Sequence, residues 1–319
     1  MEIIMRVTKN YLIIPLIIIS IICLTGCDTS KEGRTVTIAY NPDAYASAIS
    51  QIMIEKKIWD KYIPSNTTIK YVEMSNASDI RDALASGTID IATPALTAFI
   101  SGYENNMPLR LISNYGNAQV CLYSKDNIKD INDFDANDVI ATKGLNTNPH
   151  IALLAYCKEH GLNIDMYNSM LNKIPEAETI GMLSTSSSDI SGAVLSYPIT
   201  KQADALPNCN LLVDFTDIIQ DYNLGTVVCV NATFYDKNKD IIDSFEEAHK
   251  YIVENWEKDI QENAHILSKQ YNCSAEEVIK LMETFPPTTE ISGYDKLANL
   301  MYECNMLTQK PKSYKEVIE

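Results

Sequence analysis

Apolar residues alternate with polar ones over residues 36–40, as in a half-buried strand, and a second short strand is indicated at 69–72. Between them, the apolar positions of residues 46–53 recur at the spacing of one helix face. A similar helical pattern covers residues 78–87 and ends on a glycine, the residue type favoured at helix C-termini. A buried strand is indicated at 89–93, before a proline that suits a helix start. This alternation with short connections predicts a mostly parallel sheet covered by helices.

The same order of elements returns after residue 124. A strand is indicated at 139–141, a polar loop follows at 144–148, and Pro149 then opens a helix. Another strand is indicated at 193–195 and leads into a Tyr-Pro pair. The repeat predicts two similar α/β lobes, and in such sheets ligands bind at the carboxyl ends of the strands.

From about residue 236 onward the pattern is helical throughout. Ser274 followed by Glu277 is a capping box, which marks the start of one of these helices. No linker rich in Gly, Pro or Ser precedes the helical section, so we expect it to pack on a lobe. The four predicted helices cover residues 241–256, 260–271, 274–282 and 294–306.

The first 26 residues have the pattern of an export signal. Two basic residues precede an uninterrupted apolar stretch from 11 to 24, and the Leu-Thr-Gly-Cys run ending at Cys27 resembles a bacterial lipobox. The alternative is a transmembrane anchor, but the stretch is shorter than the ~20 residues that span a bilayer and contains Pro15. We therefore predict removal of residues 1–26, acylation of Cys27 with lipid such as palmitate, and a tether over 27–34.

Composition narrows the class of protein. The chain has 319 residues, 46% of them hydrophobic, and a formal net charge of −16. This length suffices for two lobes of ordinary size. The acidic balance argues against nucleic acid or anionic lipid as the main partner. We expect a globular body on a lipid tether.

Candidate catalytic and metal-binding signals are sparse. The chain has no H-E-x-x-H, G-x-S-x-G, G-x-G-x-x-G or P-loop motif, and no C-x-x-C pair. We predict no catalytic residues, no metal and no cofactor, and we expect the helix positions His160 and His249 to be exposed. After Cys27, sequence alone cannot choose between disulfides and buried thiols for six cysteines: Cys121, Cys157, Cys209, Cys229, Cys273 and Cys304.

Several stretches resemble, in order, the extracytoplasmic substrate-binding proteins of ABC importers, in the branch that serves sulfonates, taurine, nitrate and thiamine-pyrimidine precursors. One departure is that three serines, 186–188, stand where the second lobe usually has a glycine. The stretches are Leu84 to Thr93, Ile128 to Phe134, Val139 to Gly144, Cys157 to Leu162, Gly192 to Pro198, and the helical tail after Phe234.

The resemblance implies an α/β, two-lobed fold like that of type II periplasmic binding proteins, with two hinge crossings and a helical C-terminal section. Lobe I is expected at 35–119 plus 230–319 and lobe II at 120–229. We place the crossings at 119–124 and 226–231, which contain Cys121 and Cys229 respectively. If these segments were adjacent, a disulfide could join them. The alternative is two thiols in a buried hinge sheet.

The resemblance also implies a ligand in the cleft between the lobes, held by loops and helix N-termini at strand ends. Ordinary helix capping is the alternative role for the Asn, Thr and Pro residues there. Lys143 is the one basic residue of these loops, where it either neutralises an anion or is solvated. The expected ligand-binding residues are Asn41, Pro42, Tyr45, Thr93, Pro94, Ala95, Tyr115, Gly116, Asn117, Lys143, Gly144, Asn146, Thr147, Asn148 and Tyr197.

The favoured function is a monomeric, lipid-anchored solute-binding protein on the extracytoplasmic face of the cell membrane, with a small-molecule ligand and an ABC permease as partners. Two alternatives stay open. One is an enzyme, because pyrimidine-synthesis and menaquinone-pathway proteins resemble this fold, although export disfavours it. The other is a ligand-sensing lipoprotein. The tyrosines and the scarcity of Lys and Arg favour a neutral or weakly charged heteroaromatic ligand over a sulfonate-like anion.

Overall fold

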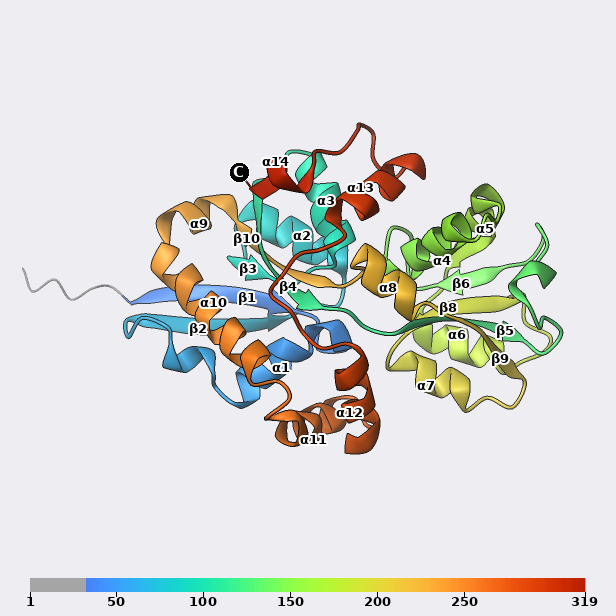
Figure 1. Ribbon diagram of the computed structural model, residues 1–319, viewed down its shortest axis with the longest axis horizontal. Coiled ribbons are helices and arrows are strands. Elements are labelled where there is room, and N and C mark those ends of the chain that lie inside the picture. Colours follow the sequence, from blue (N-terminus) through green and yellow to red (C-terminus); the bar gives the residue numbers. More distant parts are fainter. Residues whose placement is uncertain (1–32, 319) are drawn as a thin grey trace, which may run out of the picture. The chain divides into compact units, whose positions relative to one another are not determined.

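The computed structural model describes residues 33–318 (Figure 1). The predicted export signal, Cys27 and most of the predicted tether lie outside the described residues. Within 33–318, no helix combines the length and the apolar character needed to cross a membrane. Arg34, expected in the tether, is instead the first residue of strand β1. Its guanidinium donates to Asp240 at 2.9 Å and its amide donates to the carbonyl of Asn66 at 2.8 Å, which orders it.

The first sheet has the strand order β2-β1-β3-β10-β4. Strand β1 (Arg34–Tyr40) pairs in parallel with β2 (Thr67–Glu73) and with β3 (Ile91–Ala92). Strand β10 (Thr226–Asn231) runs antiparallel between β3 and β4 (Leu109–Gly116). The parallel part is the one that the hydrophobic alternation predicts.

The second sheet has the order β7-β6-β8-β5-β9 and repeats the pattern of strand directions of the first. Strand β6 (Ile140–Thr142) is parallel to β7 (Leu171–Lys173) and β8 (Gly192–Ser196). Strand β5 (Val120–Lys125) is antiparallel to β8 and to β9 (Cys209–Asp214). Two α/β halves of the same design are therefore present, as predicted.

Short helices connect the strands of both sheets. Gly87 ends α2 with a φ of +74°, the left-handed conformation that glycine adopts without steric cost, and Pro149 is the second residue of α4, so both predicted boundary signals are confirmed. These helices are η1 (Tyr45–Ser47), α1 (Ala48–Glu55), η2 (Trp59–Lys61), α2 (Ala77–Ser86), α3 (Leu96–Glu104), η3 (Ile131–Asp133), α4 (Asn148–Glu159), α5 (Ile164–Met170), α6 (Glu176–Leu183), α7 (Ile199–Asp204) and α8 (Thr216–Tyr222).

The C-terminal section is helical, as expected. Ser274 caps α12 by accepting from the amide of Glu277, and the Glu277 carboxylate accepts from the Ser274 amide, which confirms the capping box. Helices α10 and α11 pack on α1, and α13 packs on α3 and α8, so this section packs on the body of the protein. Its helices are α9 (Ala232–Lys237), α10 (Lys239–Glu254), α11 (Ile260–Gln270), α12 (Ala275–Thr284), α13 (Tyr294–Glu303) and α14 (Tyr314–Ile318).

The disulfide considered for Cys121 and Cys229 is wrong. Cys121 lies in β5 of the second sheet, whereas Cys229 lies in β10 of the first, paired with Ala92 of β3. Both are free, buried thiols whose pKa burial raises. Residues 226–231, expected as a crossing, are a strand of the first sheet, because their backbone pairs with β3 on one side and β4 on the other and their side chains are buried.

The chain passes between the sheets at residues 117–119 and 223–225, and these two segments lie in direct contact. A Cβ at Gly225 would lie 2.2 Å from the carbonyl oxygen of Gly116 and 2.5 Å from Asn117 Oδ1, so only glycine fits there. A third segment, 285–293, runs beside them, since Asn114 Nδ2 donates to the Glu290 carbonyl at 3.0 Å. We call residues 117–119 and 223–225 the two passages.

Candidate ligand-binding site

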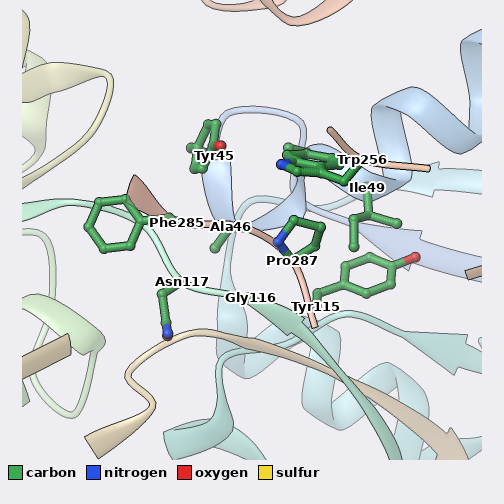
Figure 2. A pocket seen from close by; sticks show the side chains of 10 residues that line it. Tyr45, Ala46, Ile49, Tyr115, Gly116, Asn117, Trp256, Phe285 and Pro287 are labelled. Atoms are coloured by element: carbon green, nitrogen blue, oxygen red, sulfur yellow. The ribbon is translucent and has the colours of Figure 1, made fainter. Parts of the chain in front are cut away.

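A pocket opens where η1 and the start of α1 meet the end of β4 (Figure 2). In this view the rings of Phe285, Tyr45, Trp256 and Tyr115 stand around Ala46 and Pro287. Its empty volume is about 210 Å³, including the part that is open to solvent. We name it the aromatic pocket, and its lining residues are Tyr45, Ala46, Ala48, Ile49, Tyr115, Gly116, Asn117, Trp256, Phe285 and Pro287.

The turn after β1 positions Tyr45. The Asn41 side chain accepts from the Asp43 amide at 3.0 Å, and the Pro42 carbonyl accepts from Gln270 Nε2 at 3.1 Å. These bonds hold the turn against α11, so that η1 begins at Tyr45 with its ring buried. Asn41 and Pro42, predicted to touch the ligand, therefore shape the turn and do not line the pocket.

Tyr45 is part of a cluster of three tyrosines. Its ring centroid lies 6.0 Å from that of Tyr197 and 6.1 Å from that of Tyr271, while Tyr197 and Tyr271 are 5.9 Å apart. Tyr271 donates to the Ala44 carbonyl at 3.4 Å, and the Tyr197 hydroxyl lies 3.1 Å from the Cys273 sulfur. Burial raises the pKa of all three phenols, so they stay uncharged.

The tyrosine cluster joins three parts of the chain. Tyr45 follows β1 of the first sheet, Tyr197 follows β8 of the second, and Tyr271 ends α11 of the C-terminal section. Tyr45 and Tyr197 were both predicted from strand ends, and the structure brings them into contact. Tyr271 was missed, because nothing local distinguishes it among the chain's 18 tyrosines.

Tyr115 forms the wall of the pocket nearest the core. Its ring lies 4.8 Å from the His249 ring and 6.4 Å from the Phe245 ring, measured between centroids. His249, expected to be exposed, is fully buried, and its Nδ1 lies 3.1 Å from Ser113 Oγ. Loss of solvation lowers the pKa of His249 to about 3, so the imidazole is neutral at pH 7. Its spacing of four residues from Phe245 on the apolar stripe of α10 is the signal that could have predicted burial.

Trp256, Phe285 and Pro287 line the pocket although no sequence signal marked them. Trp256 follows α10, and its indole donates to the Met282 carbonyl at 3.2 Å. Phe285 ends α12, and a Cβ at Gly116 would lie 3.4 Å from Pro287 Cα, so the 285–293 segment packs directly on the end of β4. Only the tertiary fold brings these C-terminal residues to β4.

The predicted residues before α3 serve the backbone of the first sheet. The Thr93 amide donates to the Ala39 carbonyl at 3.0 Å, and the Pro94 carbonyl accepts from Val227 at 2.9 Å. Ala95 forms an isolated bridge with Thr226. None of Thr93, Pro94 and Ala95 lines the aromatic pocket.

The predicted loop before α4 is bonded internally and to the second passage. The Thr147 hydroxyl donates to the Gly144 carbonyl at 2.7 Å, and the Asn146 amide donates to His150 Nδ1 at 2.8 Å. Asn148 Nδ2 donates to the Leu224 carbonyl at 2.8 Å. Lys143 is exposed, and none of these loop residues lines the aromatic pocket. Of the predicted set, the pocket therefore gathers Tyr45, Tyr115, Gly116 and Asn117, with Tyr197 against Tyr45.

The arrangement of elements matches many solved structures. The ligand-binding component of an ABC-type import system from Staphylococcus aureus, crystallised with zinc, has 18% identity and a TM-score of 0.71, over 90% of this chain and 96% of that one. The aliphatic sulphonate-binding protein SsuA of Escherichia coli has 18% identity and a TM-score of 0.66, over 87% and 95%. The fold is that of a periplasmic binding protein.

A nitrate-binding protein, NrtA of Synechocystis, shares this periplasmic binding protein fold at 14% identity and a TM-score of 0.59, over 79% of this chain and 70% of that one. No family model matches the sequence, and no curated protein matches it. Among residues 33–318 we find no cluster of three or more His, Cys, Asp and Glu side chains placed to hold a metal ion. The likeness therefore establishes the fold only. Any ligand-binding chemistry has to be argued from the residues of this chain's own pocket.

Proposed function

We propose that this chain is the solute-binding component of an ABC importer, which captures a small organic molecule between its two α/β halves and delivers it to a membrane permease. The observation that carries the proposal is the contact between Tyr45 and Tyr197, at 6.0 Å between ring centroids. These rings come from loops at strand ends of different sheets, which is where α/β folds bind ligands. A ligand held there touches both halves.

The proposed mechanism is closure of the two halves around the ligand. The two passages are three residues each, and Gly225 packs on Gly116 at their contact, so rotation is confined to a small region. A ligand that contacts both halves favours the closed arrangement over the open one by its difference in affinity. The closed arrangement is then the form presented to the permease.

The proposed location is the extracytoplasmic face of the cell membrane, with the protein held as a monomer by lipid on Cys27. Support comes from the Leu-Thr-Gly-Cys run that follows the apolar stretch. Expression of the full chain and of Cys27→Ala in a bacterial host tests this. Wild-type protein is expected in the membrane fraction with an acyl mass on its N-terminal peptide, and the variant without it. Absence of acylation in the wild type would contradict the anchor.

A thermal-shift screen tests the binding function. Pyrimidines, sulfonates, nitrate and amino acids are added separately to residues 28–319. A ligand present at about 100 times its Kd adds ~2.7 kcal/mol to the free energy of unfolding, which raises Tm by several degrees. Transport of the stabilising compound in cells with and without the gene then tests delivery. Turnover of a compound by the purified protein, without stabilisation by any ligand, would contradict the proposal.

A further inference from the structure

The lining of the aromatic pocket contains no charged side chain. Its ten residues are aromatic, aliphatic, Gly, Pro and one Asn, with no Lys, Arg, His, Asp or Glu among them. An anion that enters such a pocket loses its water and gains no opposite charge, which is costly. Sulphonate and nitrate, the ligands named for the neighbours in fold, are anions of this kind.

Two lysines on elements next to the pocket residues are paired with carboxylates. Lys201, one turn after Tyr197, donates to Glu277 at 2.9 Å, and Lys56, at the end of α1, donates to Asp259 at 2.8 Å. His249, which lies behind Tyr115, is neutral because burial lowers its pKa to about 3. None of these groups is free to neutralise a bound anion.

Near each of the helix N-termini predicted as anion sites, one backbone amide is already bonded within the protein. The Leu96 amide, in the first turn of α3, donates to the Gly225 carbonyl at 3.1 Å. The Asn146 amide, just before α4, donates to His150 at 2.8 Å. Lys143, the one basic residue of the predicted set, is exposed and outside the pocket lining.

The pocket does offer ring surface and buried polar atoms without partners. Tyr45, Tyr115, Trp256 and Phe285 contribute four rings to its walls (Figure 2). The Tyr45 and Tyr115 hydroxyls and Asn117 Oδ1 are buried, and none of the three has a hydrogen-bond partner among residues 33–318. Tyr45 is only 2% exposed, so its hydroxyl is shielded from bulk water. The Asn117 amide points away from the rings (Figure 2), and its oxygen packs against the second passage, 2.5 Å from where a Cβ at Gly225 would lie. The Tyr45 hydroxyl is therefore the polar group assigned to the ligand, and a hydroxyl oxygen accepts from an N–H or O–H donor.

We propose that the aromatic pocket, opened at its contact with Tyr197, takes an uncharged flat ring compound whose edge carries a hydrogen-bond donor. This inference rests on the proposed solute-binding function and specifies the ligand class for it. The Tyr45 hydroxyl binds the polar edge of the ring, and Tyr115, Trp256 and Phe285 cover its faces.

The test uses three probes that differ in one property each: benzamide, benzoate and cyclohexanecarboxamide. Benzamide is flat, neutral and carries an amide donor. Benzoate keeps the shape but is an anion, and cyclohexanecarboxamide keeps the amide but is not flat. In isothermal titration calorimetry with residues 28–319, benzamide is expected to bind with a Kd of about 1 mM or lower. The other two probes, and methanesulfonate, are expected to bind at least about tenfold more weakly.

Variants connect the binding to the pocket. Tyr45→Phe keeps the ring and removes the unpartnered hydroxyl, so the fold is expected to be unaffected while benzamide binds several-fold more weakly. Phe285→Leu removes ring surface, and it should also weaken benzamide binding. Tyr251→Phe, half-buried and outside the pocket, is the matched control and should leave the affinity unchanged.

Each outcome bears on a different proposal. If benzoate or methanesulfonate binds as tightly as benzamide, the neutral ligand class is overturned while solute binding stands. If benzamide binds equally to wild type, Tyr45→Phe and Phe285→Leu, the assignment of this pocket is overturned. If no compound of this panel or of the wider screen binds, both the ligand class and the solute-binding function are overturned.

Discussion

Tyr45 and Tyr197 meet edge to face at 6.0 Å between centroids, although the first follows β1 of one sheet and the second follows β8 of the other. The contact is direct, without any intervening side chain that would keep the two halves apart. In a protein that closes on a ligand, this pair of rings is the part of the interface that a ligand must separate.

A double-mutant cycle measures the interaction free energy between the Tyr45 and Tyr197 rings. Tyr45→Leu and Tyr197→Leu, alone and together, are expected to show a coupling free energy of about 0.5–1.5 kcal/mol in urea unfolding. With saturating ligand the coupling should shrink, because the ligand takes the place of the contact. The Tyr62 and Tyr251 pair, 6.4 Å apart, is the control and should keep its coupling. A coupling that ligand leaves unchanged would contradict the role given to these rings.

Gly225→Ala tests the tight contact of the two passages. A Cβ there would lie 2.2 Å from the Gly116 carbonyl oxygen, so the backbone must shift, and we expect a loss of more than about 2 kcal/mol in the free energy of unfolding. Gly181→Ala is the matched control. Gly181 lies inside α6 with nothing within 4 Å of its added Cβ, so alanine should add about 0.5–1 kcal/mol. Equal effects in thermal unfolding would show that the passages tolerate side chains.

Lys296 of α13 binds two carboxylates from the second half of the protein. Its ammonium lies 3.0 Å from Glu159 of α4 and also pairs with Asp221 of α8. It stands over the Tyr222 ring at 4.2 Å, and Tyr222 donates to Glu159 at 2.7 Å. This network is therefore better organised than an isolated surface pair.

Lys296→Met is expected to lower the free energy of unfolding by about 1 kcal/mol at low salt and by much less in about 1 M NaCl, where charges are screened. Chemical unfolding at the two salt concentrations measures this. Lys250→Met removes an exposed pair with Glu254 at 3.6 Å, and it should have almost no effect at either concentration. A salt-independent loss for Lys296→Met would mean that its methylene chain, and not its charge, stabilises α13.

His249 predicts a pH dependence of stability. Its pKa is lowered from 6.5 to about 3 in the folded protein, because the ring is buried with no charged group among its contacts, which are Ser113, Tyr115 and Phe245. The unfolded chain therefore binds the proton more readily. Stability is fully present above pH 6.5 and is lost as the pH falls toward 3, with a slope of up to about 1.4 kcal/mol per pH unit.

Urea unfolding between pH 4 and pH 7 measures the slope. His249→Gln removes the titrating group, so its free energy of unfolding should depend less on pH than that of the wild type, even though its value at pH 7 is lower. His160→Gln, at an exposed position, should keep the wild-type slope. Parallel curves for His249→Gln and wild type would show that other groups cause the acid sensitivity.

Local signals predicted local structure well. Gly87 and Ser274 mark helix ends through backbone conformation and capping bonds, both of which depend on residues within four positions. His249 and Trp256 illustrate the limit. Their environments are set by β4 and by the segment after α12, which are far away in the sequence. A polar residue on a helix is recognised as buried only when the apolar residues on the same helix face are considered together with it.

Only part of the candidate site could be predicted, because local sequence again does not show which distant residues come together. Tyr45 and Tyr197 follow strands, and the rule that ligands meet strand ends is local enough to apply to sequence. Asn146 and Asn148 satisfy that rule too. However, the Asn146 backbone amide donates to His150, and the Asn148 side chain donates to the Leu224 carbonyl of the second passage. The type of residue in a loop does not determine whether its polar groups are already used by the protein.

The placement of β10 in the first sheet determines which of the two sheets can be completed first. The second sheet is made from one continuous stretch, β5 to β9, whereas the first sheet lacks its fourth strand until residue 231 has emerged. Until then β4 has no neighbour to pair with, because β10 alone joins it to the rest of the sheet. The sheet begun first is thus the last to be finished, and a chain delayed before residue 231 exposes a strand edge suited to pairing with other chains.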